Sequence, residues 1–224
     1  MNEDSQLREL RRTYHDRIAE LRERSSSVLR CAITGTENAT TAFLADDPSV
    51  LEPMRAGAAE AARVAAAVDD EVVAVLALES PVARDLRLIL AARDVTQISL
   101  LCVGLALTLA ARVGAAGRLA DRDLHHHVGR VGTGTADLLR LAHASWATLD
   151  PGTAADVLVE ADKTRAAQME FFGALLALTG VPMDAALDLG LSSRAFDRLA
   201  DHAVEIAERV LFAVHGRHTP VAGP

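Results

Sequence analysis

Apolar residues recur along the chain at spacings of three and four and do not alternate with polar ones, a pattern that predicts helices and no strands. The last such stretch shows it most clearly, because Phe196, Leu199, Ala203, Ile206 and Val210 fall on one face of a helix. Prolines and glycines divide the chain into six stretches of this kind. The helices expected are 4–45, 49–77, 82–113, 120–148, 152–179 and 183–215.

Helix-capping residues support these boundaries. Three dipeptides place a good N-cap residue before a proline, which suits the first helical position: Asp47-Pro48, Ser80-Pro81 and Asp150-Pro151. Gly180 and Gly216 are candidate C-caps. A small-residue linker at 114–121 divides six helices into three plus three, so the expected fold class is all-α, with two tandem three-helix bundles. The expected units are 1–115, 118–216 and a disordered tail at 217–224.

Composition strengthens the helical prediction and excludes one class of partner. Half of the residues are hydrophobic but only 3% are aromatic, so the apolar mass is mainly Ala, Leu and Val. Ala and Leu lose little entropy on entering a helix. The chain has 31 acidic and 23 basic residues, a net charge of −8. Nucleic acid is therefore not an expected partner, because phosphates would be repelled and few rings are available for stacking.

The cysteines and the most apolar segment bear on location. Cys31 and Cys102 lie far apart in apolar surroundings, which favours small core residues in a reducing compartment over a disulfide. The apolar run 95–111 contains Thr96 and Gln97 and is short of the ~20 residues of a spanning helix. We expect a buried helix in a soluble, cytoplasmic protein.

A row of acidic residues on the last stretch is a candidate metal site. Asp197, Asp201, Glu205 and Glu208 lie off the apolar face. Carboxylates one turn apart repel each other on a bare helix, whereas an oxygen-preferring cation can bring them together. The alternative is an ordinary solvated face, with Glu205 paired to Arg209 four residues on. The spacing leaves both open.

Other candidate features carry less chemistry. The run 125–127 is three histidines that point about 100° apart on a helix, which favours a surface run over a metal site. The sequence Gly-Thr-Gly-Thr at 132–135 lacks the rest of a phosphate-binding loop and predicts a kink. Trp146 is expected to anchor bundle packing. No nucleophile elbow and no His-Glu-x-x-His motif occurs, so catalysis is not expected.

Three segments carry a family resemblance. The opening contains RRTYHDRIAEL, Val75 begins VLALESPVARDLR, and Arg198 begins RLADHAVEIAERVLFAVHG. In order and spacing they resemble signature segments of the PhoU family of phosphate-signalling regulators. The resemblance runs from about Arg11 to Gly216 and implies a fold of two three-helix bundles side by side.

The resemblance also implies a metal site on the second bundle. Its ligand positions fall on Asp162, Asp197 and Asp201, with Asp197 where glutamate is usual in the family. The implied cofactor is a divalent or trivalent metal ion, with iron, manganese, zinc and magnesium all compatible with carboxylate ligands. His202 follows the pair and is expected in a second layer or at the surface.

The first bundle departs from the family pattern. Its corresponding positions are Ala62, Leu100 and Gly104, none of which can bind a hard cation, so we expect metal in the second bundle only. The resulting face, with Leu107 and Thr108 nearby, is apolar. It predicts either a surface for dimerisation or partner docking, or deeper burial of this helix within its own bundle.

The resemblance further implies a function. The chain is expected to be a negative regulator of phosphate uptake and phosphate-starvation signalling, and not an enzyme. It would act as a metal-binding adaptor between the ATPase subunit of a phosphate ABC transporter and the sensor histidine kinase of a two-component system. A homodimer, peripheral to membrane complexes, is expected. The alternatives are a helical carboxylate metalloenzyme, and a metal-free scaffold or paralogous regulator.

Overall fold

The computed structural model describes residues 3–113, 122–180 and 182–216, and the described part is helical with no strand. The all-α prediction is therefore confirmed. The elements are α1 (Glu3–Ala45), a short 3₁₀ helix η1 (Pro48–Val50), α2 (Leu51–Glu79), α3 (Ala83–Ala110), α4 (Arg122–Thr148), α5 (Pro151–Ala177) and α6 (Met183–His215).

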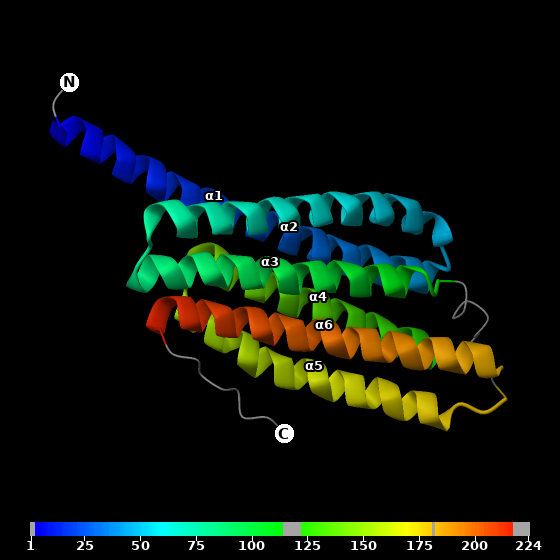
Figure 1. Cartoon of the computed structure of the whole chain (residues 1–224). Coiled ribbons are helices and arrows are strands. Elements are labelled where there is room, and N and C mark those ends of the chain that lie inside the picture. Colours follow the sequence, from blue (N-terminus) through cyan, green and yellow to red (C-terminus); the bar gives the residue numbers. More distant parts are fainter. Residues whose placement is uncertain (1–2, 114–121, 181, 217–224) are drawn as a thin grey trace.

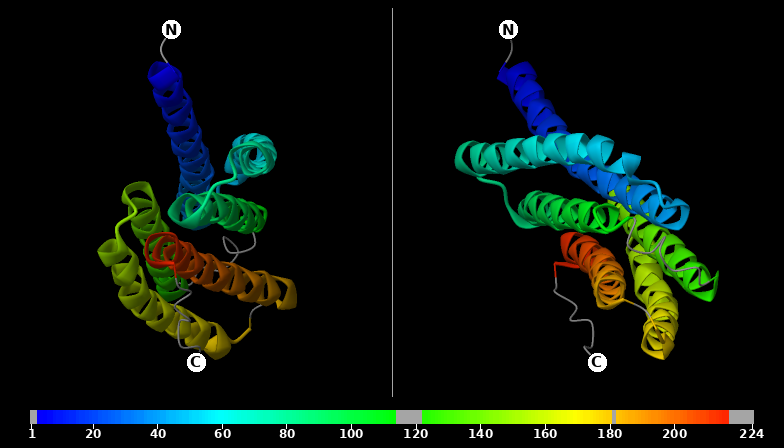
Figure 2. Two further views of the ribbon diagram at one scale, coloured as in Figure 1. Left: turned by 60° about the vertical axis from the view of Figure 1, so that its left-hand side comes forward. Right: turned by 90° about the vertical axis from the view of Figure 1, so that its right-hand side faces the viewer.

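The six long helices form two three-helix bundles that lie side by side. Helices α1, α2 and α3 pack on one another, as do α4, α5 and α6, and the bundles meet where α1 contacts α4 and α3 contacts α6 (Figures 1 and 2). The N-terminal end of α1 extends beyond the other helices (Figure 1). Predicted boundaries at 115 and 118, and the predicted disorder of 217–224, fall outside the described residues.

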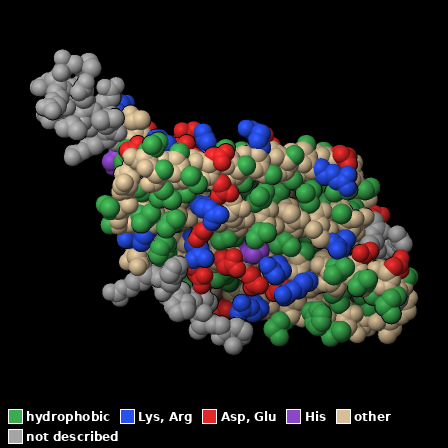
Figure 3. Space-filling model, in the orientation of Figure 1, with side chains coloured by type: hydrophobic (Ala, Val, Ile, Leu, Met, Phe, Trp, Pro, Cys, Tyr) green, Lys and Arg blue, Asp and Glu red, His purple; other side chains and the backbone are tan. Residues whose placement is uncertain are grey.

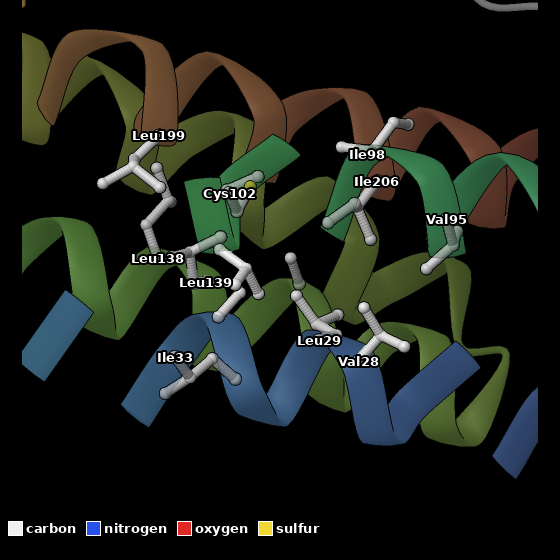
Figure 4. Close-up of a cluster of buried hydrophobic side chains, with 14 of the residues drawn as sticks. Val28, Leu29, Ile33, Val95, Ile98, Cys102, Leu138, Leu139, Leu199 and Ile206 are labelled. Atoms are coloured by element: carbon white, nitrogen blue, oxygen red, sulfur yellow. The ribbon is translucent and has the colours of Figure 1, made fainter. Parts of the chain in front are cut away.

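The two bundles share one hydrophobic core. Val28 and Leu29 of α1, Cys102 of α3, Leu139 of α4 and Ile206 of α6 gather between the bundles (Figure 4). All five are at most 1% exposed. Because burial of apolar area is the main favourable term in folding, this continuous core holds the bundles together.

Two of the three predicted N-caps are confirmed. Asp47 accepts a hydrogen bond from the backbone of Ser49, and Asp150 caps α5. The Thr153 side chain and two backbone N–H groups donate to Asp150 and hold the pKa of its carboxyl below the usual range. Gly216, with φ of 72°, ends α6 as predicted.

Two predictions about local structure are wrong. Ser80 does not begin α3; it ends α2 in the left-handed conformation, since a residue before proline is disfavoured in the right-handed helix. The glycines at 132 and 134 do not kink α4, which runs unbroken through them. Gly132 instead faces α1, where an added Cβ would lie 2.5 Å from Oγ1 of Thr40. Close helix packing, and not a turn, accounts for this glycine.

One helix in the described part of the chain is long and apolar enough to cross a membrane. It is α3, and half of its most apolar window is buried inside the bundles. The helix packs against α1, α2 and α6, and its residues Val95, Ser99 and Cys102 are fully buried. Its apolar character is thus largely explained by its place in the core, as the sequence predicted.

Candidate metal site on the second bundle

Two of the three predicted metal ligands lie together on α6. Asp197 and Asp201 are one helical turn apart, outside the buried face formed by Phe196, Leu199 and Ile206. Partial burial, followed by the negative charge of Asp197, raises the pKa of the Asp201 carboxyl. The two carboxylates therefore interact unfavourably in the metal-free chain, which a bound cation would relieve.

Arginines neutralise much of this acidic charge. Arg194 forms an ion pair with Asp197, three residues along the same helix. Arg165 of α5 lies 3.8 Å from Asp162, measured from Nη1 to Oδ1, and its charge also lowers the pKa of Asp201 against the effects above. A cation entering the site would compete with both guanidinium groups.

The third predicted ligand does not join the pair. The side chain of Asp162 is 81% exposed on α5. Within the described ranges no group of three or more His, Cys, Asp and Glu side chains is placed to hold a metal ion. The donor chemistry of Asp197 and Asp201 fits a hard cation, whereas the three-carboxylate arrangement is not assembled in this structure. The three-ligand site stays a prediction.

His202 does not lie at the surface, which was one of the two places that the sequence allowed for it. It is only 3% exposed, and its Nδ1 lies 2.9 Å from Oε2 of Glu205. That contact lowers the pKa of the Glu205 carboxyl. A sequence signal existed, because His202 stands three residues after Leu199 and four before Ile206, on the buried face.

A polar chain between helices was missed by the sequence analysis. Arg209 does not form an ion pair with Glu205; its Nε lies 3.1 Å from Oδ2 of Asp94 on α3. Asp69 of α2 accepts a hydrogen bond from the Gln97 side chain at 3.0 Å, and Nε of Arg93 lies 3.0 Å from the other oxygen of Asp69. These contacts connect α2, α3 and α6 across the two bundles. No helical period could reveal them, because each partner is on another helix.

The first bundle carries no acidic side chains at the corresponding positions. Leu100 is half-buried against the core and Ala62 is exposed. Gly104 is exposed, with open space where a Cβ would be. Its neighbour Leu101 is 56% exposed, whereas Leu107 packs against the core. The packing of Leu107 agrees with burial of this helix within its own bundle, whereas a role of this face in dimerisation or docking stays a prediction.

Two of the segments that resemble the family's signatures meet in space. The Tyr14 hydroxyl of α1 donates to Asp85 of α3 at 3.1 Å. Burial, the hydrogen bond and the charge of Asp85 raise the pKa of Tyr14 to about 12. Arg17 binds Glu71 of α2 at 2.7 Å and Glu79 at 3.3 Å. These residues join the three helices of the first bundle, which is a structural role for the opening segment.

These features define an all-α protein of two joined three-helix bundles with a carboxylate pair on the surface of the second. The PhoU domain matches residues 128–210, most of that second bundle. The chain is 30% identical over 214 residues to the phosphate-specific transport system accessory protein PhoU homolog 2 of Mycobacterium tuberculosis, covering 92% of this chain and 99% of that one. It is also 30% identical over 212 residues to PhoU homolog 1 of Mycobacterium leprae, covering 92% and 95% of the two chains. The chain belongs to the PhoU family.

Solved structures agree on the fold. The crystal structure of PhoU from Pseudomonas aeruginosa superposes with a TM-score of 0.85 at 19% identity, over 91% of this chain and all of that one. The phosphate transport system regulatory protein PhoU from Streptococcus pneumoniae gives 0.83 at 15% identity, over 93% of this chain and all of that one. At these identities the likeness concerns the fold alone.

Proposed function

We propose that this protein is a negative regulator of phosphate uptake and phosphate-starvation signalling. The observation that carries the proposal is the 30% identity, along nearly the whole chain, to proteins named as accessory proteins of the phosphate-specific transport system. In this role it acts on the cytoplasmic side of the membrane as an adaptor between the ATPase subunit of a phosphate transporter and a sensor histidine kinase.

The arrangement of the second bundle favours regulation over catalysis. A helical carboxylate metalloenzyme directs its ligands into the bundle core, where substrate and metal are shielded from water. Here the core face of α6 is apolar, and the acids Asp197 and Asp201 lie outside it. An outward pair of this kind suits an ion or a partner bound at the surface.

A genetic experiment tests the regulatory role. The chain is expressed in a bacterium that lacks its own PhoU and carries a reporter driven by a phosphate-starvation promoter. We expect repression of the reporter in phosphate-rich medium and release on starvation. A reporter that stays fully active in rich medium, with the protein present and folded, would overturn the proposal. Pull-down with purified ATPase subunit and kinase cytoplasmic domain then tests the two partners separately.

The metal ion forms a separate part of the proposal. Asp197 and Asp201 would hold the ion, and Asp162, exposed on the neighbouring α5, would be the third ligand. When bound, the ion supplies positive charge that fixes these carboxylates. Because Arg194 is paired with Asp197, removal of Arg194 should strengthen metal binding.

Elemental analysis tests the ion directly. Protein incubated with iron, manganese, zinc or magnesium and then desalted should retain metal, and Asp197→Asn with Asp201→Asn should lose it. Asp156→Asn, an exposed acid elsewhere on α5, is the matched control. Equal metal content in the double variant and wild type would refute the ligand assignment.

Self-association through α3 is also part of the proposal. Leu101 and Gly104 form an exposed apolar surface where a second helix could approach closely. Light scattering of Leu101→Glu tests it, since this side chain is exposed in the monomer and the change should leave the fold intact. The variant is expected to be monomeric where the wild type is a dimer. A dimer in both would contradict this surface.

A further inference from the structure

A groove of about 310 Å³ lies between α5 and α6, next to the acidic pair. Met169 and Phe172 of α5 form one wall, and Gly190 of α6 lies opposite them. The groove runs from the middle of α5 and α6 toward the end of the second bundle where α5 finishes and α6 begins. Neither the carboxylate pair nor the core explains the apolar character of this end.

The surface around the groove is unusually apolar for a solvent-facing region. On α5, Met169 is 71% exposed, Phe172 53% and Leu176 73%, and their spacing of three and four residues places them on one helical face. On α6, Leu187 is 60% exposed and Leu191 41%. Hydrophobic side chains gather at this end of the molecule, over the right-hand ends of α5 and α6 (Figure 3). A contiguous group of this kind indicates a docking surface, whereas single exposed apolar residues do not.

The shape of the surface favours a helix as its occupant. Gly190 lines the groove without a side chain, and the space a Cβ would occupy has no atom within 4 Å. A hollow with open space at Gly190 and flexible methionine at its side accommodates the apolar face of an amphipathic helix. A lipid surface, in contrast, needs no hollow between two helices.

The polar end of the groove indicates the charge of that helix. The side chains of Arg165 and Arg194 line the groove together with Asp197 and are 56% and 65% exposed. Arg194 pairs with Asp197 and Arg165 lies 3.8 Å from Asp162, so the guanidinium N–H groups not used in these pairs are the ones accessible to a partner. Gln168 is 93% buried in the lining, and its Nε2 has no hydrogen-bond partner in the described structure. A buried donor without an acceptor is costly, and a carboxylate brought into the groove could supply the acceptor.

We infer that this groove binds an amphipathic helix of a partner protein, with apolar side chains over Met169 and Phe172 and a carboxylate at Arg165 and Arg194. This inference rests on the proposed adaptor function, because an adaptor must bind a partner protein. The groove is tested with purified protein and a peptide, whereas the regulatory role is tested with the reporter strain. Failure of the peptide to bind would therefore leave the regulatory role untouched.

A synthetic helix provides the probe. The peptide carries leucines at spacings of three and four and a glutamate beyond one end of the apolar face, with a fluorescent label for anisotropy. Wild-type protein is expected to bind it. Met169→Glu and Leu176→Glu are expected to bind at least about tenfold more weakly, as when an interface anchor is lost. Val159→Glu is the matched control, because Val159 is 62% exposed on α5 but belongs neither to the groove lining nor to the exposed face of Met169, Phe172 and Leu176.

Charge reversal tests the orientation. Arg165→Glu with Arg194→Glu should lose the glutamate peptide and gain a peptide with lysine in its place, with unchanged circular dichroism for every variant. Equal binding by wild type, Met169→Glu and Val159→Glu would overturn the inference, as would no binding to wild type. Binding to phosphatidylglycerol vesicles in place of peptide would assign the groove to a membrane. Self-association that is abolished by Leu187→Glu would assign it to a second copy of this chain.

Discussion

Gly132 of α4 and Thr40 of α1 meet where the two bundles cross. A Cβ built on Gly132 would lie 2.5 Å from Oγ1 of Thr40 and 2.9 Å from its Cβ, which is closer than real Cβ atoms come to their neighbours. Thr40 cannot turn away freely, because it is buried and its hydroxyl donates to the carbonyl of Thr36 at 2.8 Å. The absence of a side chain at Gly132 therefore sets the distance between α1 and α4.

Replacing this glycine should destabilise the protein. Gly132→Ala gains about 1 kcal/mol of helix propensity but must push α1 and α4 apart, and overpacking of a close contact costs about 1–3 kcal/mol. We expect a net loss of about 0–2 kcal/mol in the free energy of unfolding, measured by chemical denaturation.

A second glycine provides the control. Gly173 is exposed on α5, with no atom within 4 Å of the space that a Cβ would fill. Gly173→Ala should therefore stabilise the protein by about 0.5–1 kcal/mol, the usual difference between these residues in a helix. If both alanine variants were stabilised equally, the close approach of α1 and α4 would not limit the packing.

Arg22 should contribute to stability through the end of α4. Its Nη2 donates to the carbonyl of Ala147 at 2.9 Å, and its guanidinium lies 5.9 Å from the ring centre of Trp146. Burial lowers the pKa of Arg22, and a charged donor at a helix C-terminus is stabilising. Arg22→Met should cost about 1–3 kcal/mol of unfolding free energy.

The single tryptophan of the chain makes this measurable. Denaturation followed by the fluorescence of Trp146 should show the loss in Arg22→Met. Arg24→Met removes only a surface pair with Glu20 and should change the unfolding free energy by less than about 0.5 kcal/mol. Similar losses in the two variants would mean that the α4 contact contributes nothing of its own.

The helical period predicts the buried faces well, because apolar residues that repeat at this period lie on one side of a helix, and that side packs into the core. Phe196, Leu199 and Val210 are predicted and found in the core of α6. His202 shares their face although its side chain is polar, and its buried imidazole has Glu205 as a partner for Nδ1. Position on the helix decides burial there, and residue type does not.

Contacts between helices lie beyond what the period can show. Gly132 approaches Thr40, which lies 92 positions earlier in the chain. In the sequence, two nearby glycines indicate a helix break as readily as a close contact between helices. The site shows the same limit. Two carboxylates one turn apart are visible in the sequence, whereas the effect of Arg165 on the pKa of Asp201 depends on how α5 packs against α6.

Metal removal should leave the fold intact. The core shared by the six helices is apolar and does not include the acids on α6, so its burial energy is independent of any ion there. Treatment with a chelator should leave the far-UV circular dichroism and the unfolding midpoint nearly unchanged. A large loss of helix after chelation would show that the ion is structural.

His143 should make stability depend on pH in a defined direction. Its pKa in the folded chain is lowered by burial and by the positive charge of Arg30, against the charge of Glu23. In the unfolded chain the value returns to about 6.5. Between the two values the unfolded state binds more protons, so the free energy of unfolding rises with pH. This contribution is complete above about pH 6.5 and is lost as the pH falls toward the folded value.

Denaturation at about pH 5.5 and about pH 7.5 measures this slope. His143→Gln should reduce the difference between the two pH values relative to wild type, since every other titrating group is present in both proteins. Arg30→Gln should reduce it as well, because the positive charge that disfavours imidazolium is gone. Glu23→Gln should increase it, because the carboxylate that favours imidazolium is gone. Equal slopes in wild type and His143→Gln would show that this histidine is not held in its neutral form by the fold.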